Sequence, residues 1–172
     1  GMKKQQLREQ YLNRRMNLSE EALQSMSQFI ADKFFRHILL QSIETVHVFI
    51  PIRNRNEVNT WPIINRLIGF GKTLVISKTD TESNLMVNYF HQPDMPMKKN
   101  RWGIYEPVEG TICPDDKIDC VLLPLLVADK KGHRIGYGGG YYDRFLVNCR
   151  KDTLKVGLSF FPPVEAIEDV PP

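Results

Sequence analysis

The stretch "CVLLP", Cys120–Pro124, decides the fold of this 172-residue chain. It is a short apolar run, and two similar runs precede it at Thr45–Pro51 and Thr73–Ser77. Runs of this length that are rich in Val, Ile and Leu are typical of strands buried on both faces, as in parallel sheets between helices. Leu85–Phe90 and Leu154–Phe160 are further strand candidates. The pattern predicts an α/β domain with a mostly parallel central sheet.

Helical patterns fill the segments around these runs. Lys3–Met16 predicts a basic amphipathic helix, and Ser19 caps a second helix that we expect to continue to about Leu40. Trp61–Phe70 predicts a crossover helix between two strands, and Tyr141–Cys149 predicts a helix at the end of a glycine-rich segment. Helices on both faces of the sheet would make a three-layer αβα sandwich.

The composition is that of a soluble globular protein, with 42% hydrophobic and 25% charged residues. We expect a single domain over residues 2–172, and Gly1 before Met2 is typical of a cleaved expression tag. The formal charge of +3 comes from dispersed basic residues, which disfavours nucleic acid as a partner.

Cellular location is predicted from the cysteines and the apolar segments. The three cysteines are odd in number and form no CxxC pair, so they indicate neither a disulfide framework nor a zinc site. A reducing cytoplasm is the expected location. Apolar stretches such as Phe34–Leu40 are too short and too charged to span a bilayer, so we expect no membrane partner.

The segment "GHRIGYGGGYYDR", Gly132–Arg144, follows an apolar strand and leads into a predicted helix. Glycines at the entry to a helix let backbone N–H groups approach phosphate oxygens. The segment lacks the GK[ST] ending of a Walker loop, and its glycines do not fit GxGxxG. Arg134 can pair with phosphate, and Asp143 would repel phosphate unless a cation such as Mg²⁺ lies between them. The segment therefore indicates a site for a nucleotide triphosphate with Mg²⁺.

Simpler interpretations stay open at this point. The glycines can serve a tight turn alone, and Asp143 can complement the dipole of the helix that it begins. The cations of the first helix can be a solvated face.

Five features together resemble one known family, the 5-formyltetrahydrofolate cyclo-ligases, also called methenyltetrahydrofolate synthetases. They are the glycine segment, the Lys4-xxx-Arg8 pair, Glu57 within "NEVNT", "RWGIYEP" at Arg101–Pro107 and "KVGLSF" at Lys155–Phe160. The likeness extends over essentially the whole chain. It implies an αβα fold and the ATP- and Mg²⁺-dependent conversion of 5-formyltetrahydrofolate to 5,10-methenyltetrahydrofolate, ADP and phosphate.

The resemblance also implies roles for individual residues. Arg134 and Asp143 would be catalytic, Asp143 would bind the metal, and we expect the protein to be a monomer. The implied ATP-binding residues are Lys4, Arg8, Arg134, Ile135, Gly136, Tyr137, Gly138, Gly139, Gly140, Tyr141 and Tyr142. The implied folate-binding residues are Ile50, Glu57, Trp102, Tyr137, Gly138, Gly139, Gly140 and Tyr141. Trp102 can also be read as a partly buried core residue.

Two departures from the family pattern keep other functions open. Many relatives carry an arginine where this chain has Tyr137, so one phosphate-directed charge is expected to be absent there. The family also brings a second aspartate to the metal from a strand that would lie beyond Pro172. The alternatives are a non-catalytic protein that binds folate or nucleotide, and another ATP-dependent ligase on the same scaffold.

Lys98 and Lys99 lie in a segment that we expect to be a proline-punctuated loop. Their positive charge would suit a polyglutamate tail on the folate, or it can be simply solvated.

Overall fold

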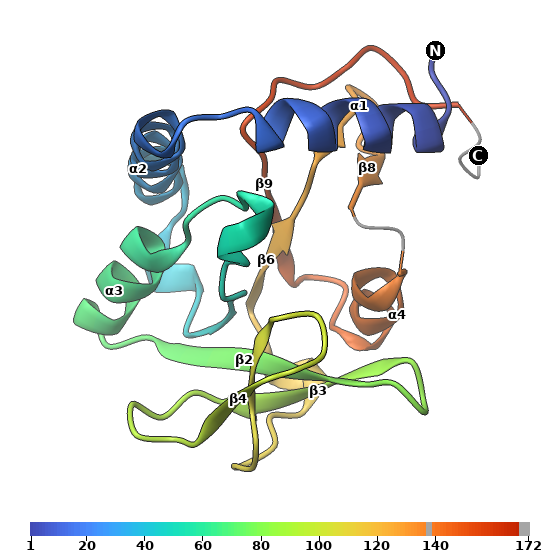
Figure 1. The fold of residues 1–172 in the computed structure, drawn as a ribbon. Coiled ribbons are helices and arrows are strands. Elements are labelled where there is room, and N and C mark those ends of the chain that lie inside the picture. Colours follow the sequence, from blue (N-terminus) through green and yellow to red (C-terminus); the bar gives the residue numbers. More distant parts are fainter. Residues whose placement is uncertain (137–138, 169–172) are drawn as a thin grey trace.

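The computed structural model describes residues 1–136 and 139–168, and its centre is a five-stranded sheet with the order β3-β2-β1-β6-β9 (Figure 1). Parallel pairing joins β2 to β1, β1 to β6 and β6 to β9, whereas β3 runs antiparallel along β2. The predicted mostly parallel sheet is therefore confirmed. The strands are β1 (Thr45–His47), β2 (Thr73–Asp80), β3 (Leu85–Phe90), β6 (Cys120–Pro124) and β9 (Leu154–Leu158).

Helices cover both faces of this sheet (Figure 1). The helices α2 and α3 pack on one face and α4 on the other, which confirms the αβα arrangement. The first helix, α1, lies instead over a small two-stranded sheet made of β7 and β8. The bounds are α1 (Lys4–Met16), α2 (Glu20–His37), α3 (Trp61–Gly69), α4 (Tyr141–Asn148), β7 (Val127–Ala128) and β8 (Arg134–Ile135), with 3₁₀ turns at η1 (Leu40–Ser42), η2 (Arg53–Arg55) and η3 (Asp115–Lys117).

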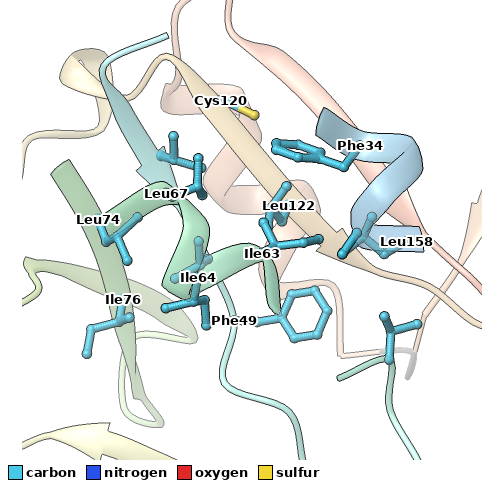
Figure 2. Close-up of a cluster of buried hydrophobic side chains, with 14 of the residues drawn as sticks. Phe34, Phe49, Ile63, Ile64, Leu67, Leu74, Ile76, Cys120, Leu122 and Leu158 are labelled. Carbon is cyan, nitrogen blue, oxygen red and sulfur yellow. The ribbon is translucent and has the colours of Figure 1, made fainter. Parts of the chain in front are cut away.

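Alternation along β6 divides the core between the two faces. Cys120 and Leu122 belong to the apolar cluster that includes side chains of α2 and α3, whereas Val121 and Leu123 belong to the cluster that includes Phe145 of α4. Figure 2 shows the larger cluster, in which side chains of α3 lie against those of β2 and β6. Because successive strand residues point to opposite faces, a strand buried on both sides must be apolar throughout. This is why "CVLLP" has no polar alternation.

Several boundaries differ from the predicted ones. The strand β1 ends at His47, four residues before Pro51, although the Val48 N–H still donates to the Val75 carbonyl. The strand β2 continues to Asp80 because the antiparallel partner β3 extends its pairing. The helix α2 ends at His37, since the β-branched Ile38 has an extended backbone.

Four strands were not predicted, namely β4, β5 and the short pair β7 and β8. The segment around Lys98 and Lys99 is not a simple loop, because β4 (Met97–Lys99) pairs antiparallel with β5 (Tyr105–Pro107).

Within residues 1–136 and 139–168, no helix has the length and apolar character needed to cross a membrane.

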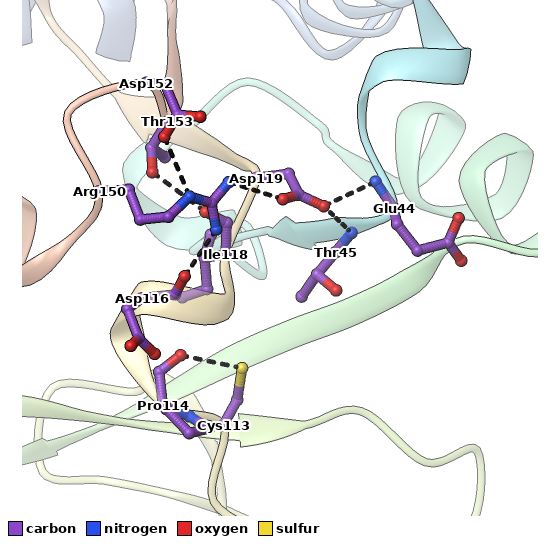
Figure 3. A network of polar contacts seen from close by, with 10 residues as sticks. All are labelled: Glu44, Thr45, Cys113, Pro114, Asp116, Ile118, Asp119, Arg150, Asp152 and Thr153. Atoms are coloured by element: carbon purple, nitrogen blue, oxygen red, sulfur yellow. Dashed lines mark hydrogen bonds and ion pairs between the residues drawn. The ribbon is translucent and has the colours of Figure 1, made fainter.

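A polar network fastens the amino ends of β1 and β6 (Figure 3). One oxygen of Asp119 accepts the backbone N–H groups of Glu44 and Thr45, each at 2.9 Å. Its other oxygen accepts from Arg150 at 2.8 Å, and Arg150 also binds Asp152. Partial burial raises the pKa of Asp119, but the bonds from Thr45 and Arg150 outweigh this effect and hold it below the ordinary 3.8. The charged carboxylate therefore stabilises the start of the sheet.

Replacing Asp119 by Ala should lower the free energy of unfolding by about 2 kcal/mol, because two strand-end N–H groups and Arg150 lose their acceptor. Urea denaturation at pH 7 measures this loss. As the pH falls from about 4 through the lower pKa of folded Asp119, the carboxylate becomes protonated. The difference in free energy of unfolding between the wild type and Asp119→Ala should therefore narrow. The control is Asp152→Ala, which removes an exposed partner of Arg150 and should cost less than about 0.5 kcal/mol. Equal losses in the two variants would contradict this role for Asp119.

Candidate active site

A cavity of about 540 Å³ opens where β1 and β6 end. Every predicted site residue that the structure describes lines it. These residues are Lys4, Arg8, Ile50, Glu57, Trp102, Arg134, Ile135, Gly136, Gly139, Gly140, Tyr141, Tyr142 and Asp143. The predicted residues Tyr137 and Gly138 lie outside the described residues. The structure thus brings residues from distant parts of the chain together, while their individual roles stay predictions.

The hairpin of β7 and β8 carries Arg134 and leads into the glycine segment. Its turn is closed by Asp129, whose carboxylate accepts the backbone N–H groups of Lys131 and His133 and a bond from the His133 ring. Burial raises the pKa of Asp129, but these bonds and one from Ile167 N–H outweigh it and lower the pKa to about 2. A fixed turn gives Arg134 a defined place at the cavity.

Two arginines bind backbone carbonyls within the glycine segment. Arg8 of α1 donates from Nε to the Gly136 carbonyl at 3.2 Å. Arg144 of α4 donates to the Gly139 carbonyl at 2.9 Å and to the Asn84 carbonyl at 2.8 Å. The second bond ties the segment to the turn between β2 and β3. Gly136 is therefore anchored to α1 and Gly139 to α4.

Arg134 and Asp143 form an ion pair at the cavity wall. The Arg134 Nη2 lies 2.6 Å from Asp143 Oδ1, with the Arg134 side chain 29% exposed and that of Asp143 76% exposed. Arg134 belongs to β8 and Asp143 to the first turn of α4, so the pair joins the two ends of the intervening glycine-rich connection. An exposed ion pair is worth little to stability, so both groups can exchange partners for a ligand.

The side chains around the cavity limit how the predicted Mg²⁺ could bind. No cluster of three His, Cys, Asp or Glu side chains occurs in the described parts of the chain. Mg²⁺ commonly keeps several waters and binds proteins through one or two carboxylates together with substrate phosphates. The exposed carboxylate of Asp143 on the cavity wall fits that mode, and it does not fit a closed cage of protein ligands.

Glu57 is buried, follows the end of β1 and lines the same cavity. Its Oε1 accepts the Ile52 N–H at 2.6 Å, and the nearby Thr60 hydroxyl donates to the Phe49 carbonyl. These bonds hold the connection between β1 and α3 in one conformation. An ionised carboxylate only accepts hydrogen bonds, which suits a ligand that presents N–H groups.

Trp102 is not a core residue. It is 37% exposed and lines the cavity, and the Arg101 guanidinium lies over its ring at 4.3 Å. Asn100 orders this turn by accepting the backbone N–H of Trp102. The position suits an aromatic contact with a ligand.

His47 lines the cavity although its apolar surroundings in the sequence indicate only a structural role. Its Nε2 lies 2.5 Å from the Ser77 hydroxyl and 3.1 Å from Asn88 Oδ1, and Ser77 donates to the same Asn88 oxygen. This arrangement favours the tautomer with the proton on Nε2. Burial lowers the pKa of His47 to about 4, so the ring is neutral near pH 7. The ring also packs against Tyr142 and Phe145, so it supports α4 beneath the site.

A second hollow, of about 860 Å³, lies between α2 and β9. Mainly apolar side chains line it, and it contains none of the predicted site residues. The smaller cavity is therefore the candidate active site.

Comparison with known proteins agrees with the geometry of this cavity. The sequence model of the 5-formyltetrahydrofolate cyclo-ligase family matches residues 1–172. The chain belongs to this family. The predicted resemblance is thereby confirmed, and with it the assignment of the chain to the ligases of folate one-carbon metabolism.

Named relatives of this cyclo-ligase family support the assignment. A 5-formyltetrahydrofolate cyclo-ligase of Haemophilus influenzae is 30% identical over 179 residues, which cover 98% of this chain and 90% of the relative. The solved 5,10-methenyltetrahydrofolate synthetase of Aquifex aeolicus superposes with a TM-score of 0.77 at 30% identity, over 98% of this chain and 82% of that one. The synthetase of Mycoplasma pneumoniae gives a TM-score of 0.72 at 26% identity, over 91% and 84%.

Gly140→Ala should destabilise the protein by about 1 to 2 kcal/mol. Gly140 precedes α4 with φ of 71°, and an added Cβ would lie 2.8 Å from Arg144 Nη1. Gly136→Ala is the matched control, because a Cβ there meets only the Pro124 carbonyl oxygen, at 3.6 Å. Thermal unfolding of the two variants checks the prediction. A loss of stability at Gly136 as large as that at Gly140 would contradict it.

Proposed function

We propose that this protein catalyses the ATP- and Mg²⁺-dependent cyclisation of 5-formyltetrahydrofolate to 5,10-methenyltetrahydrofolate, with release of ADP and phosphate. The main observation in support is that a single cavity has one wall suited to phosphate groups and another suited to a folate. Lys4, Arg8 and Arg134 lie beside the glycine segment, and Glu57 and Trp102 line the same space. A reaction that transfers a phosphoryl group from ATP to a folate needs both walls in one site.

The chemistry begins with a poor nucleophile. The formyl oxygen of the substrate attacks the γ-phosphorus of ATP, the bond to the β-phosphate oxygen breaks, and ADP leaves with that electron pair. The neighbouring secondary amine of the folate then attacks the formyl carbon. Its proton is lost, and phosphate leaves with the former formyl oxygen. No side-chain nucleophile is required, so rate depends on positioning and on neutralising charge.

The residues of the cavity would divide this work. Lys4, Arg8 and Arg134 would attract the phosphate oxygens, and the backbone of the glycine segment would allow their close approach. Asp143 would hold Mg²⁺, which when bound supplies positive charge to the phosphates. Glu57 would accept hydrogen bonds from the N–H groups of the pterin edge, and Ile50 and Trp102 would cover its faces. On ATP binding, Arg134 would break its ion pair with Asp143 and bind a phosphate group instead.

The activity test is optical. The product absorbs in the near ultraviolet and 5-formyltetrahydrofolate does not, so a band should appear when protein, ATP and Mg²⁺ are combined. Omitting either ATP or Mg²⁺ should abolish it. Binding of both ligands without any band would favour the non-catalytic alternative.

Arg134→Ala and Asp143→Ala should each lower kcat/KM about 10²- to 10³-fold, because each removes an electrostatic stabiliser at the reacting phosphate. Initial rates of the near-ultraviolet band measure this loss. Lys131→Ala, an exposed change on the same hairpin, is the control and should retain wild-type rates. Wild-type rates in both site variants would show that the ion pair has no part in the reaction.

We also propose that the substrate carries a polyglutamate tail that contacts β4. Lys98 and Lys99 are exposed there, and Lys99 Nζ lies 5.2 Å from the ring centre of Tyr105, which lines the cavity. These exposed cations would attract the carboxylates of a tail that extends out of the cavity from a bound folate.

Replacing both Lys98 and Lys99 by Ala should raise KM for a polyglutamylated substrate about two- to fivefold, as expected for exposed charges. KM for the monoglutamate should change little, which makes that substrate the internal control. Equal effects on the two substrates would refute the contact.

A further inference from the structure

A buried carboxylate besides that of Glu57 lines the active-site cavity. Glu106 of β5 is 7% exposed and belongs to the cavity lining. It lies in the segment "RWGIYEP", and the proposed reaction scheme assigns it no role. A carboxylate that is withdrawn from water needs hydrogen-bond donors, because desolvation of a charge is costly. The donors that Glu106 meets therefore decide what it can do.

One oxygen of Glu106 is held by the edge of β2. The Thr73 N–H and the Val75 carbonyl of β2 point toward β1, and Thr79 follows the same alternation. The strand β1 ends opposite Val75, so Thr79 lies beyond it. There Glu106 Oε2 accepts the Thr79 N–H at 2.7 Å. The carboxylate is thereby fixed at the edge of β2, past the end of β1, where the cavity opens.

The other oxygen of Glu106 is available to a ligand. Among the residues that the structure describes, Oε1 has no hydrogen-bond or ion-pair partner, and Lys98, the neighbour of Glu106 across the β4–β5 pair, is exposed. In the same part of the chain, the side-chain polar atoms that lack both a partner and contact with solvent are His47 Nδ1 and Asn100 Nδ2. Glu106 Oε1 is not one of them, so it retains accessible surface.

The surroundings of Glu106 suit a flat ring. Trp102 and Ile104 precede it in the same segment and line the cavity, as do Ile76 of β2 and Met86 of β3. Apolar side chains pack against the faces of a ring, while a polar group at the edge fixes its orientation.

We infer that Glu106 Oε1 accepts a hydrogen bond from an N–H group of the pterin ring of the folate. This inference rests on the proposed cyclo-ligase function. The phosphate groups of ATP are excluded as partners because a carboxylate repels them. The reduced pterin ring is uncharged and has several N–H groups, whereas adenine has a single amino group. The buried carboxylates of the cavity, Glu57 and Glu106, therefore match the pterin better than adenine.

The test is calorimetric titration of the full chain with 5-formyltetrahydrofolate, comparing the wild type with Glu106→Gln. The glutamine oxygen can still accept the Thr79 N–H, but its NH₂ group would then face the N–H of the ligand in place of Oε1. Affinity for 5-formyltetrahydrofolate should fall about 10- to 100-fold. Glu109→Gln removes the same charge at an exposed position outside the cavity lining and should stay within about twofold of wild type.

A parallel titration uses Mg²⁺ with a non-hydrolysable β,γ-methylene ATP analogue, which Glu106→Gln should bind as the wild type does. Thermal unfolding is followed for each variant, and all titrations are run below the lowest unfolding temperature. Glu106→Ala should unfold at a lower temperature than Glu106→Gln, because it loses the acceptor for Thr79 N–H.

Wild-type affinity for 5-formyltetrahydrofolate in Glu106→Gln would overturn the inference and leave Glu106 as a support for the edge of β2. A loss confined to the ATP analogue, or shared equally by both ligands, would also overturn it. If the wild-type protein does not bind 5-formyltetrahydrofolate, the proposed function fails together with the inference.

Discussion

Parallel pairing of β1 with β6 is the constraint on which the site depends. In a parallel pair both carboxyl ends reach the same edge, so the chain that leaves β1 and the chain that leaves β6 emerge side by side. The first exit leads to Arg55 and Glu57, and the second leads through the β7–β8 hairpin to Arg134 and the glycine segment. Residues separated by more than 70 positions thereby share one cavity. Asp119 supports this register from the opposite end of both strands.

The lining of the cavity contains both cations and carboxylates. Its cations gather around the glycine segment and α1, whereas buried Glu57 is engaged by the backbone of its own connection. Asp143 contacts the proposed phosphate-binding cation Arg134, and the carboxylate of this pair is exposed. The arrangement suits two ligands of different chemistry, since a polyanion and a donor-rich ring system each meet the appropriate partner.

Features that depend on residues close together in the sequence could be predicted, whereas features that depend on contacts between distant residues could not. The buried strands are local patterns, so "CVLLP" predicted the sheet. The glycine segment resembles a family motif, so "GHRIGYGGGYYDR" predicted a segment that lines the cavity, while its contact with phosphate stays a proposal. The strand β4 has only Met97, Lys98 and Lys99 and exists because β5 pairs with it. Arg55 reaches the cavity because its backbone is held by a residue 40 positions earlier. His47 looked like part of an apolar strand, because its partners Ser77 and Asn88 lie 30 and 41 positions away.

The central claim is that ATP and the folate formyl group meet in this one cavity. It can be tested by following the formyl oxygen. The protein is given 5-formyltetrahydrofolate labelled with ¹⁸O in the formyl group, together with unlabelled ATP and Mg²⁺, and the released phosphate is analysed by mass spectrometry. Direct attack of the formyl oxygen on the γ-phosphorus predicts one ¹⁸O atom in each phosphate released by cyclisation. Unlabelled phosphate released alongside the methenyl product would contradict the account.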